Sequence, residues 1–369
     1  MKLFQVTLII LLFLGSRASA QNATKYSNEF LQIGVGARAL GMGNCVVATT
    51  RDVTSGYWNP AGLVGVKENL QVSLMHASYF AGIANYDYGS FATKPNENSA
   101  IGLSVIRFGV DGILNTTDLI RNGEVDYSRV TTFSAVDYAF IGSYAQNIRL
   151  KRSRNNKLSW GTNAKVIHRK VGQFGSAWGF GFDVGLQMIN EKNGWSYGLT
   201  GRDITSTFNN WNYTLSQSTK DIYTQTGNKI PVNTLEITLP RFIAAAAKTF
   251  NKEKYLITVE GNMDITTDGK RNVLVRTNFI SLDPHVGGEF GYKIKGDNTV
   301  LYFRTGINNI QSEILKNGKK SLTLVPSIGV GFNIGKFTLD YAFTDIGNVS
   351  AALYTNVISL KLGINKTTN

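Results

Sequence analysis

The sequence predicts an all-β protein: a fourteen-stranded antiparallel transmembrane β-barrel whose lumen is closed by an N-terminal hatch. Three observations support this expectation. The chain begins like an exported protein, its later part alternates apolar with small or polar residues, and its connectors alternate between short and long. It has 38 glycines and only 6 prolines in 369 residues, and 11% of its residues are aromatic. Behind an export leader, that combination is typical of the strands of an outer-membrane barrel.

Residues 1–20 have the features of a secretory signal peptide. Lys2 supplies the positive start, LIILLFLG forms a short apolar core, and ASA precedes Gln21 as a small-residue cleavage site. The apolar core is too short to cross a bilayer as a helix, and no cysteine follows the cleavage site to accept a lipid. We therefore expect an exported protein whose mature chain begins at Gln21.

The stretch AWGFGFDVGLQMI, residues 177–189, shows the alternation clearly. Successive side chains of a strand point to opposite faces of the sheet. One face carries the large apolar side chains of Trp178, Phe180, Phe182, Val184, Leu186 and Met188. The other face carries Ala177, Gly179, Gly181, Asp183, Gly185 and Gln187. We expect the first face to contact lipid and the second to line a packed lumen, because a soluble sandwich would carry more charge on its second face.

The same alternation predicts fourteen strands along the chain. The expected spans are 70–80, 83–93, 99–110, 132–147, 158–172, 177–189, 195–205, 236–249, 255–266, 284–294, 299–310, 322–334, 336–345 and 355–364. Connectors after even-numbered strands are mostly short polar turns, such as KPNEN and KGDN. The longest connectors follow odd-numbered strands, at 111–131, 206–235, 267–283 and 311–321. Bacterial barrels place short turns in the periplasm and long loops outside, so this parity supports an even strand count.

The segment 21–69 does not alternate, and we expect it to form a hatch inside a barrel made of residues 70–369. It ends in GYWNPAGLVG, which combines turn-forming residues with two aromatics and carries no charge. Asn59 can cap a helical turn, Pro60 suits the first helical position, and Gly62 permits close backbone approach. The apolar side chains of this segment have no core of their own, so the lumen is the place available to bury them.

Two motifs in this segment resemble a known family. GARALGMGNCVVAT at 36–49 and WNPAGL at 58–63, followed by a barrel, resemble the PorV/PorQ family and, more broadly, the FadL-type barrels. The matching hatch-motif residues are Arg38, Gly41, Met42, Gly43, Asp52, Trp58, Asn59, Pro60, Ala61 and Gly62. Cys45 departs from the pattern, which usually has a small residue such as alanine there. The resemblance implies a fourteen-stranded FadL-like barrel in the outer membrane of a Gram-negative, Bacteroidetes-like bacterium, plugged by its N-terminal segment.

The first function that the resemblance implies is a PorV-like role in the type IX secretion system. Such a barrel binds the C-terminal domain of secreted cargo at its outer rim and pairs with a large translocon barrel or a cell-surface attachment complex. The candidate partner-binding surface is the 206–235 loop, through Phe208, Trp211, Tyr213 and Tyr223. Aromatic residues supply contact area at low entropic cost, but these four could equally pack the loop or join the interfacial aromatic girdle. The branch, PorV-like or PorQ-like, stays open.

The alternative function is FadL-like uptake of a hydrophobic small molecule through the lumen and a gap in the wall. The inward-facing Gly179, Gly181 and Gly185 could make room for a ligand pocket or for the hatch, and we expect the hatch. Pro240 and Pro284 are candidate kinks, because proline lacks the N–H that a strand needs to complete its ladder.

We expect neither catalysis nor a cofactor or bound metal. The sequence has no G-x-S-x-G element, and its single cysteine and three scattered histidines form no familiar zinc spacing. His168 is expected at the rim or in the lumen rather than as a general base. We expect a set of inward charges to form luminal ion pairs that brace the hatch: Asp137, Asp183 and Asp340 with Arg107 and Arg304.

The formal net charge of +13 indicates either an anionic partner or simply a solvated basic surface. Export argues against nucleic acid as that partner. Outer-membrane lipid or lipopolysaccharide is the natural counter-charge for an exported basic barrel.

Overall fold

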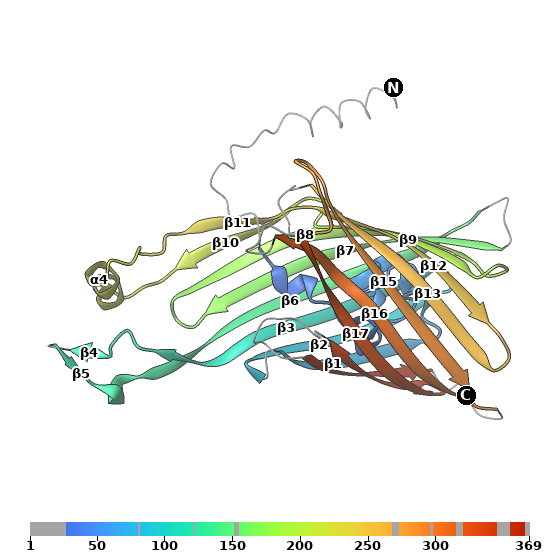
Figure 1. The fold of residues 1–369 in the computed structure, drawn as a ribbon, viewed down its shortest axis with the longest axis horizontal. Coiled ribbons are helices and arrows are strands. Elements are labelled where there is room, and N and C mark those ends of the chain that lie inside the picture. Colours follow the sequence, from blue (N-terminus) through green and yellow to red (C-terminus); the bar gives the residue numbers. More distant parts are fainter. Residues whose placement is uncertain are drawn as a thin grey trace, which may run out of the picture.

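The computed structural model describes residues 27–79, 82–121, 123–150, 155–267, 273–295, 298–314, 320–344 and 355–365. It is a β-barrel with a few short helical segments (Figure 1). These are η1 (Glu29–Gln32), α2 (Ala37–Gly41), α3 (Ser55–Trp58), η2 (Pro60–Gly65), η4 (Tyr127–Arg129) and α4 (Gln217–Gln225). Within the described ranges, no helix is both long and apolar enough to span a membrane. The predicted signal peptide lies outside these ranges.

Fourteen antiparallel strands of the described chain close the barrel, as the sequence predicts. They are β1 (Leu70–Tyr79), β2 (Ala84–Asn96), β3 (Ser99–Asn115), β6 (Thr131–Ile148), β7 (Asn156–Val171), β8 (Gly175–Asn190), β9 (Trp195–Arg202), β12 (Arg241–Asn251), β13 (Tyr255–Thr266), β15 (Ser281–Lys293), β16 (Thr299–Ile314), β17 (Lys320–Ile334), β18 (Phe337–Thr344) and β19 (Thr355–Ile364). Each strand pairs with the next one in this order. The first and last strands pair from Leu70↔Ile364 to Ser78↔Asn356, which closes the ring.

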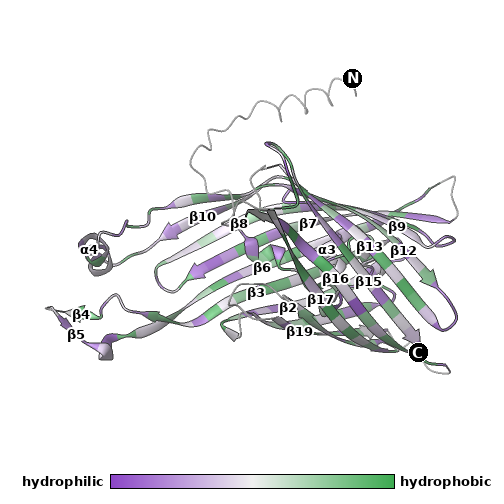
Figure 2. Ribbon diagram, in the orientation of Figure 1, coloured by the Kyte–Doolittle hydropathy of each residue, from purple (hydrophilic) through white to green (hydrophobic). Residues whose placement is uncertain are grey.

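The predicted alternation of faces is confirmed. On β8 the apolar row faces outward, with Trp178 52% and Phe180 60% exposed to the surroundings of the protein, while the intervening glycines are buried. β17 shows the same pattern, with Ile328, Val330 and Phe332 on the outer face. Figure 2 shows hydrophobic and hydrophilic residues alternating along the strands. This outer surface is suited to lipid and the inner one to a packed lumen.

Two long arms project from the same end of the barrel (Figure 1). The β4–β5 arm, residues 114–130, carries the small strands β4 (Ile120–Arg121) and β5 (Glu124–Val125). The α4 arm, residues 207–238, consists of β10 (Thr207–Tyr213), α4 and β11 (Thr234–Thr238). We call this the long-loop end. Much of the connector predicted at 206–235 is therefore regular structure, because β10 and β11 extend the ladder beyond the barrel wall.

The wall has a first interruption where single strands were predicted at 195–205 and 236–249. β9 ends at Arg202 and β10 begins at Thr207, while β11 and β12 are separated by Leu239 and Pro240. β9 pairs with β12, whereas β10 pairs with β8 and β11. Pro240 cannot donate a ladder hydrogen bond, which accounts for a break at this position.

A second interruption lies between β15 and β16. β15 pairs with β13 from Ser281 onward, but its pairing with β16 begins only at Val286↔Ile307. The short strand β14 (Val275–Arg276) pairs with the first two residues of β15 instead. Pro284 lies in this stretch, inside β15 rather than at its predicted start, and the β16 ladder is irregular at residues 308–311. We call this place the β15–β16 seam.

Candidate functional site

The N-terminal segment lies inside the barrel and makes hydrogen bonds to inward-facing side chains around the wall. The Ala37 amide donates to Ser359 Oγ on β19 at 3.0 Å, and the Gly43 amide donates to Ser327 Oγ on β17 at 3.1 Å. On the opposite side, Asn163 Nδ2 of β7 donates to the Gly56 carbonyl at 2.8 Å. Buried backbone groups must find partners, and here the wall supplies them. The segment is thereby attached to several strands at once.

Asn59 and Pro60 form the turn that the sequence indicates. The Asn59 side-chain oxygen accepts a hydrogen bond from the Ala61 amide at 3.2 Å and so caps η2, with Pro60 at its first position. Its Nδ2 donates to the Val47 carbonyl at 3.1 Å and to the Leu186 carbonyl of β8 at 3.0 Å. Asn59 is fully buried. One side chain therefore joins the turn, the rest of the segment and the wall.

Glycines on the N-terminal segment and on the inner face of the wall allow the two to pack closely. A Cβ added at Gly306 would lie 2.2 Å from the Gly43 nitrogen, and one at Gly185 would lie 2.1 Å from Asn59 Oδ1. The expectation that inward glycines accommodate the N-terminal segment is thus right for Gly185. It is wrong for Gly179 and Gly181, whose missing side chains leave room for Asn209 and Thr207 of the wall itself.

The motif residues Gly41, Met42, Gly62 and Ala61 are buried in this fit, together with Trp58. A Cβ at Gly41 would lie 3.0 Å from the Gly329 Cα of β17, and one at Gly62 would lie 2.3 Å from the Thr50 carbonyl oxygen. The Trp58 indole donates to the Val35 carbonyl at 2.9 Å. The guanidinium of Arg202 on β9 lies over the rings of Tyr57 and Trp58, at 4.5 and 5.4 Å from their centroids.

Arg38 and Asp52, the two charged motif residues, are paired with charges of the wall. Arg38 donates to both carboxylate oxygens of Glu289 on β15, at 2.9 and 3.1 Å. Arg304 on β16 also donates to Glu289, at 2.7 Å, and continues to Asp340 on β18 at 2.8 Å. Asp52 accepts from the Lys361 ammonium of β19 at 2.6 Å. These ion pairs connect the segment with charges on four strands of the wall, β15, β16, β18 and β19.

The environment of Asp52 favours its ionised form. Burial by itself would raise the pKa of this carboxyl, but the Lys361 ammonium and hydrogen bonds from Lys361 and Thr54 outweigh burial and lower the pKa well below its usual value. Cys45 is the opposite case, because burial and the nearby Glu260 carboxylate raise the pKa of its thiol. A buried thiol of this kind is unreactive, in agreement with a purely structural role at this position.

Sequence reasoning missed Glu260 of β13. Its side chain is fully buried, and its two oxygens accept from the Ala48 amide at 2.7 Å and the Thr49 hydroxyl at 2.6 Å. The signal that could have found it is its place in the strand alternation, since Glu260 falls on the inner face two residues after Thr258, while Ile257 and Val259 fall on the outer face. A carboxylate on the inner face of a barrel strand needs a partner, and here the partner is the N-terminal segment.

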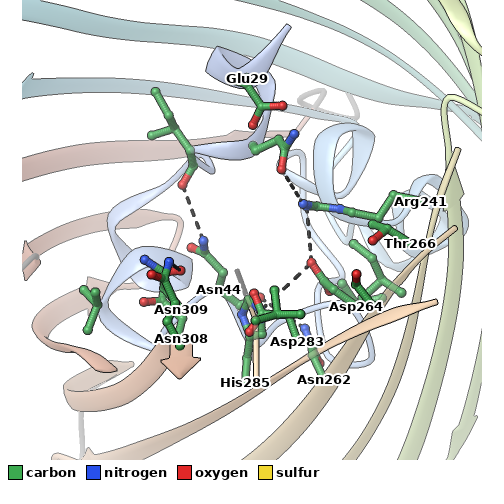
Figure 3. A pocket seen from close by; sticks show the side chains of 18 of the residues that line it. Glu29, Asn44, Arg241, Asn262, Asp264, Thr266, Asp283, His285, Asn308 and Asn309 are labelled. Carbon is green, nitrogen blue, oxygen red and sulfur yellow. Dashed lines mark hydrogen bonds and ion pairs between the residues drawn. The ribbon is translucent and has the colours of Figure 1, made fainter. Parts of the chain in front are cut away.

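A cavity of about 560 Å³ remains between this segment and the wall at the long-loop end (Figure 3). We call it the outer cavity. Residues of η1 and Asn44 line one side, and side chains from β12, β13, β15 and β16 line the other. Most of these side chains can form hydrogen bonds. The labelled ones include Glu29, Asn44, Arg241, Asn262, Asp264, Asp283, His285, Asn308 and Asn309.

The charges of the outer cavity are matched in pairs. Arg241 Nη2 lies 3.4 Å from Asp264 Oδ2, and its Nη1 donates to Gln32 Oε1 at 2.8 Å. His285 Nε2 lies 3.3 Å from Asp283 and 4.0 Å from Asp264. Among the described residues, no cluster of three or more potential ligands can hold a metal ion. The cavity is therefore a polar chamber in which Asp264 and Asp283 face cationic partners, and Glu29 adds a third carboxylate to its lining.

The four aromatic residues proposed as a partner-binding loop lie in different surroundings. Trp211 of β10 is only 5% exposed, with its ring stacked on Tyr213 and under the guanidinium of Arg169. Phe208 faces outward beside Phe180 of β8, and Tyr223 is partly exposed on α4. The structure thus brings Trp211 and Tyr213 together and separates both from Tyr223.

Strongly exposed apolar side chains occur instead on the β4–β5 arm, which sequence reasoning did not single out. Leu114 and Ile120 are 66% exposed and Tyr127 is 78% exposed. The signal was available, because the connector at 111–131 contains these residues beyond the end of a predicted strand. It was overlooked because aromatic content favoured the 206–235 connector.

The predicted luminal ion pairs are partly as expected. Asp340 pairs with Arg304, but Asp183 pairs with Lys165 at 2.7 Å and Asp137 with Arg169 at 2.9 Å. The prediction that Arg107 faces the lumen is wrong. This arginine lies on the outward face of β3, where its partners are Asp87 at 3.6 Å and Asp111 at 3.2 Å. His168 also lies on the outward face, with its ring centroid 4.2 Å from that of Trp178.

Comparison with known proteins agrees with this architecture. Residues 16–152 match the family model of the type IX secretion system protein PorV. Among solved structures, the toluene transporter TodX of Pseudomonas putida superimposes with a TM-score of 0.56 at 10% identity, covering 90% of this chain and 99% of that one. The toluene transporter TbuX of Ralstonia pickettii gives 0.51 at 13%, covering 91% and 100%. No curated protein sequence matches.

The closed wall of fourteen antiparallel strands is therefore a β-barrel whose fold is shared with these two solved structures. The sequence of its N-terminal region, residues 16–152, is similar to the PorV family.

Proposed function

We propose that this barrel is an accessory of the type IX secretion system that binds secreted cargo, or the translocon or attachment complex, at the cell surface. The observation that carries the proposal is the family match over residues 16–152. That region contains the N-terminal segment, the first barrel strands and the entire β4–β5 arm. The match therefore includes one of the two arms at the long-loop end.

The surface chemistry of the β4–β5 arm supports this proposal. The arm places Ile120, Val125 and Tyr127 at the long-loop end with more than half of each side chain exposed. Exposed apolar groups on a projection beyond the membrane wall are costly in water and mark surfaces for protein partners. Phe208 and Tyr223 on the α4 arm complete the surface, whereas Trp211 stabilises its base. Lipid and lipopolysaccharide are expected around the outer wall.

We also propose that residues 21–69 act as a hatch, between a signal peptide at 1–20 and a barrel at 70–369. Supporting this proposal, the segment is attached by Asn59, Arg38 and Asp52 to three parts of the wall. A barrel held closed in this way is an adaptor for export rather than the export pore. It has no enzymatic role in this proposal.

The test is purification of the tagged protein from native outer membranes under mild conditions, followed by mass spectrometry of proteins and extracted lipids. We expect a large translocon barrel or secreted proteins that share a C-terminal domain to co-purify. Exchanging Ile120 and Tyr127 for serine should reduce that recovery, because truncating anchor residues of an interface weakens binding. A serine at Ile294, exposed at the opposite end of the barrel, is the matched control. Recovery of the barrel without protein partners contradicts the proposal.

A second candidate, FadL-like uptake of a hydrophobic molecule, is favoured by the two interruptions of the wall. The break at Pro240 and the β15–β16 seam are places where a molecule could pass sideways between strands. The polar lining of the outer cavity argues against a hydrophobic occupant there. A stoichiometric hydrophobic molecule in the lipid extract of the lone barrel would support this second function.

A further inference from the structure

The outer cavity contains buried hydrogen-bonding atoms that have no partner among the residues that the structure describes. Ser281 of β15 is 2% exposed and Asn262 of β13 is 5% exposed, yet Ser281 Oγ and Asn262 Oδ1 make no hydrogen bond. Asn44 Oδ1 and Asp283 Oδ1 are also buried and make no hydrogen bond. All four residues line one chamber, and so does His285, whose Nε2 also makes no hydrogen bond. Burying polar groups without partners is costly, so this chamber is suited to a polar occupant.

The chemistry of these atoms indicates what the occupant must provide. Two are amide oxygens and one is a carboxylate oxygen, and all three can only accept hydrogen bonds. The fourth, the Ser281 hydroxyl, can donate or accept. A complementary ligand therefore carries several O–H or N–H donors close together.

The charge balance selects among donor-rich ligands. Asp264 already faces Arg241, and Asp283 already faces His285. A cationic ligand would have to compete with these pairs, and an anionic ligand would face both carboxylates. A neutral ligand leaves the pairs intact and still satisfies the acceptors.

The volume of the outer cavity and its access from outside also suit a small-molecule ligand. The cavity volume of about 560 Å³ lies within the range typical of small-molecule sites and far exceeds the space of one ordered water. Arg241, Thr266 and Ser281 stand at the ends of their strands nearest the long loops, so the chamber is reached from the outer side. Figure 3 shows the polar side chains converging on this space.

We propose that the outer cavity binds a neutral polyhydroxylated molecule the size of a mono- or disaccharide. Its hydroxyl groups donate to Asn262, Asp283 and Asn44 and exchange a hydrogen bond with Ser281. This inference rests on the cavity alone and does not depend on the role in secretion.

The experiment uses the full-length protein in an amine-oxide detergent, because sugar-based detergents would occupy the site. Saturation-transfer NMR with glucose, maltose and myo-inositol reports binding, and spermidine and toluene serve as cationic and hydrophobic competitors. We expect saturable binding of at least one polyol at millimolar concentration. Ser281→Ala should weaken it severalfold, and Asn262→Leu, which also fills space, by at least about tenfold.

Ser90→Ala is the matched control, because Ser90 is also buried, at 6% exposure, but lies on β2 outside the cavity. Thermal unfolding of each variant checks that the barrel is intact, and Ser281→Ala removes a single oxygen, so it tests the site even if Asn262→Leu fails to fold. Absence of polyol binding, or equal binding in wild type and Ser281→Ala, overturns the proposal. Saturable binding of spermidine or toluene without any polyol assigns the cavity to another ligand class and also overturns it.

Discussion

The two halves of the lumen differ in how the N-terminal segment meets the wall. Around Gly43 and Asn59 the segment approaches the strands so closely that a single added Cβ at Gly306 or Gly185 would collide with it. Around Asn44 and Gln32 the same segment meets the wall through single hydrogen bonds, from Asn262 Nδ2 to the Asn44 carbonyl at 3.1 Å and from Arg241 to Gln32 at 2.8 Å, and the outer cavity lies beside them. The first region is packed like a protein core, and the second is an open polar chamber. Stability is therefore concentrated in the close contacts, while ligand-binding capacity is concentrated in the open part.

The strongest test of this difference is a bulky residue in the close contact. Gly306→Val places its side chain against the backbone of Met42 and Gly43, so we expect the N-terminal segment to be displaced and the barrel to lose about 3 kcal/mol or more in unfolding free energy. Thermal unfolding and limited proteolysis measure both effects. Gly261→Val is the control, because a Cβ at that outward position has no heavy atom nearer than 3.9 Å. Equal behaviour of the two variants would contradict the close packing of this region.

The next largest effect is expected at the cap. Replacing Asn59 and Pro60 by alanines removes the cap of η2 and the bond to Leu186, and we expect a loss of about 2 kcal/mol. The segment should become sensitive to protease, and the conductance of the barrel in planar bilayers should rise. Asn228→Ala, on the exposed α4 arm, is the comparison. Unchanged conductance together with unchanged protease resistance would argue against a hatch.

The pH dependence of the Asp52–Lys361 pair gives a smaller, directional test. Because the pKa of Asp52 is lowered in the folded protein, its ion pair stabilises the seated segment above the pKa of the unfolded carboxyl. That contribution falls as pH decreases from about 4 toward the lower folded pKa. Asp52→Asn should reduce protease resistance at neutral pH, and its difference from wild type should shrink in acid. A constant difference across that range would show that the charge of Asp52 is unimportant.

The smallest effect on stability is expected in the outer cavity. Ser281 Oγ has no partner, so Ser281→Ala should change the free energy of unfolding by less than about 0.5 kcal/mol. Thermal unfolding measures this directly. A large loss of stability would mean that the outer cavity belongs to the closely packed region, and the two regions would then not differ.

Particular residues show how far sequence reasoning reached. The outward rows of β8 and β17 were predictable, because membrane strands must alternate and lipid selects large apolar side chains. Asn59 and Pro60 were predictable because capping is a local interaction. The roles of Gly179 and Gly181 were not, since both depend on β10 lying beside β8 rather than in a loop. The prediction failed for Arg107 because large apolar residues occur on both faces of β3 beside it, Leu103 outside and Ile106 inside, so the alternation does not mark the outer face there.

The sequence by itself predicted an export leader, and it determined the strand number, the closed barrel and the turn around Pro60. These depend on local periodicity and turn chemistry, which a single chain displays directly. Only the tertiary structure decided the pairing of Glu260 with the Thr49 region, the seam beside Pro284 and the outer cavity. Each joins residues distant in sequence, and burial, not spacing, brings their polar groups together.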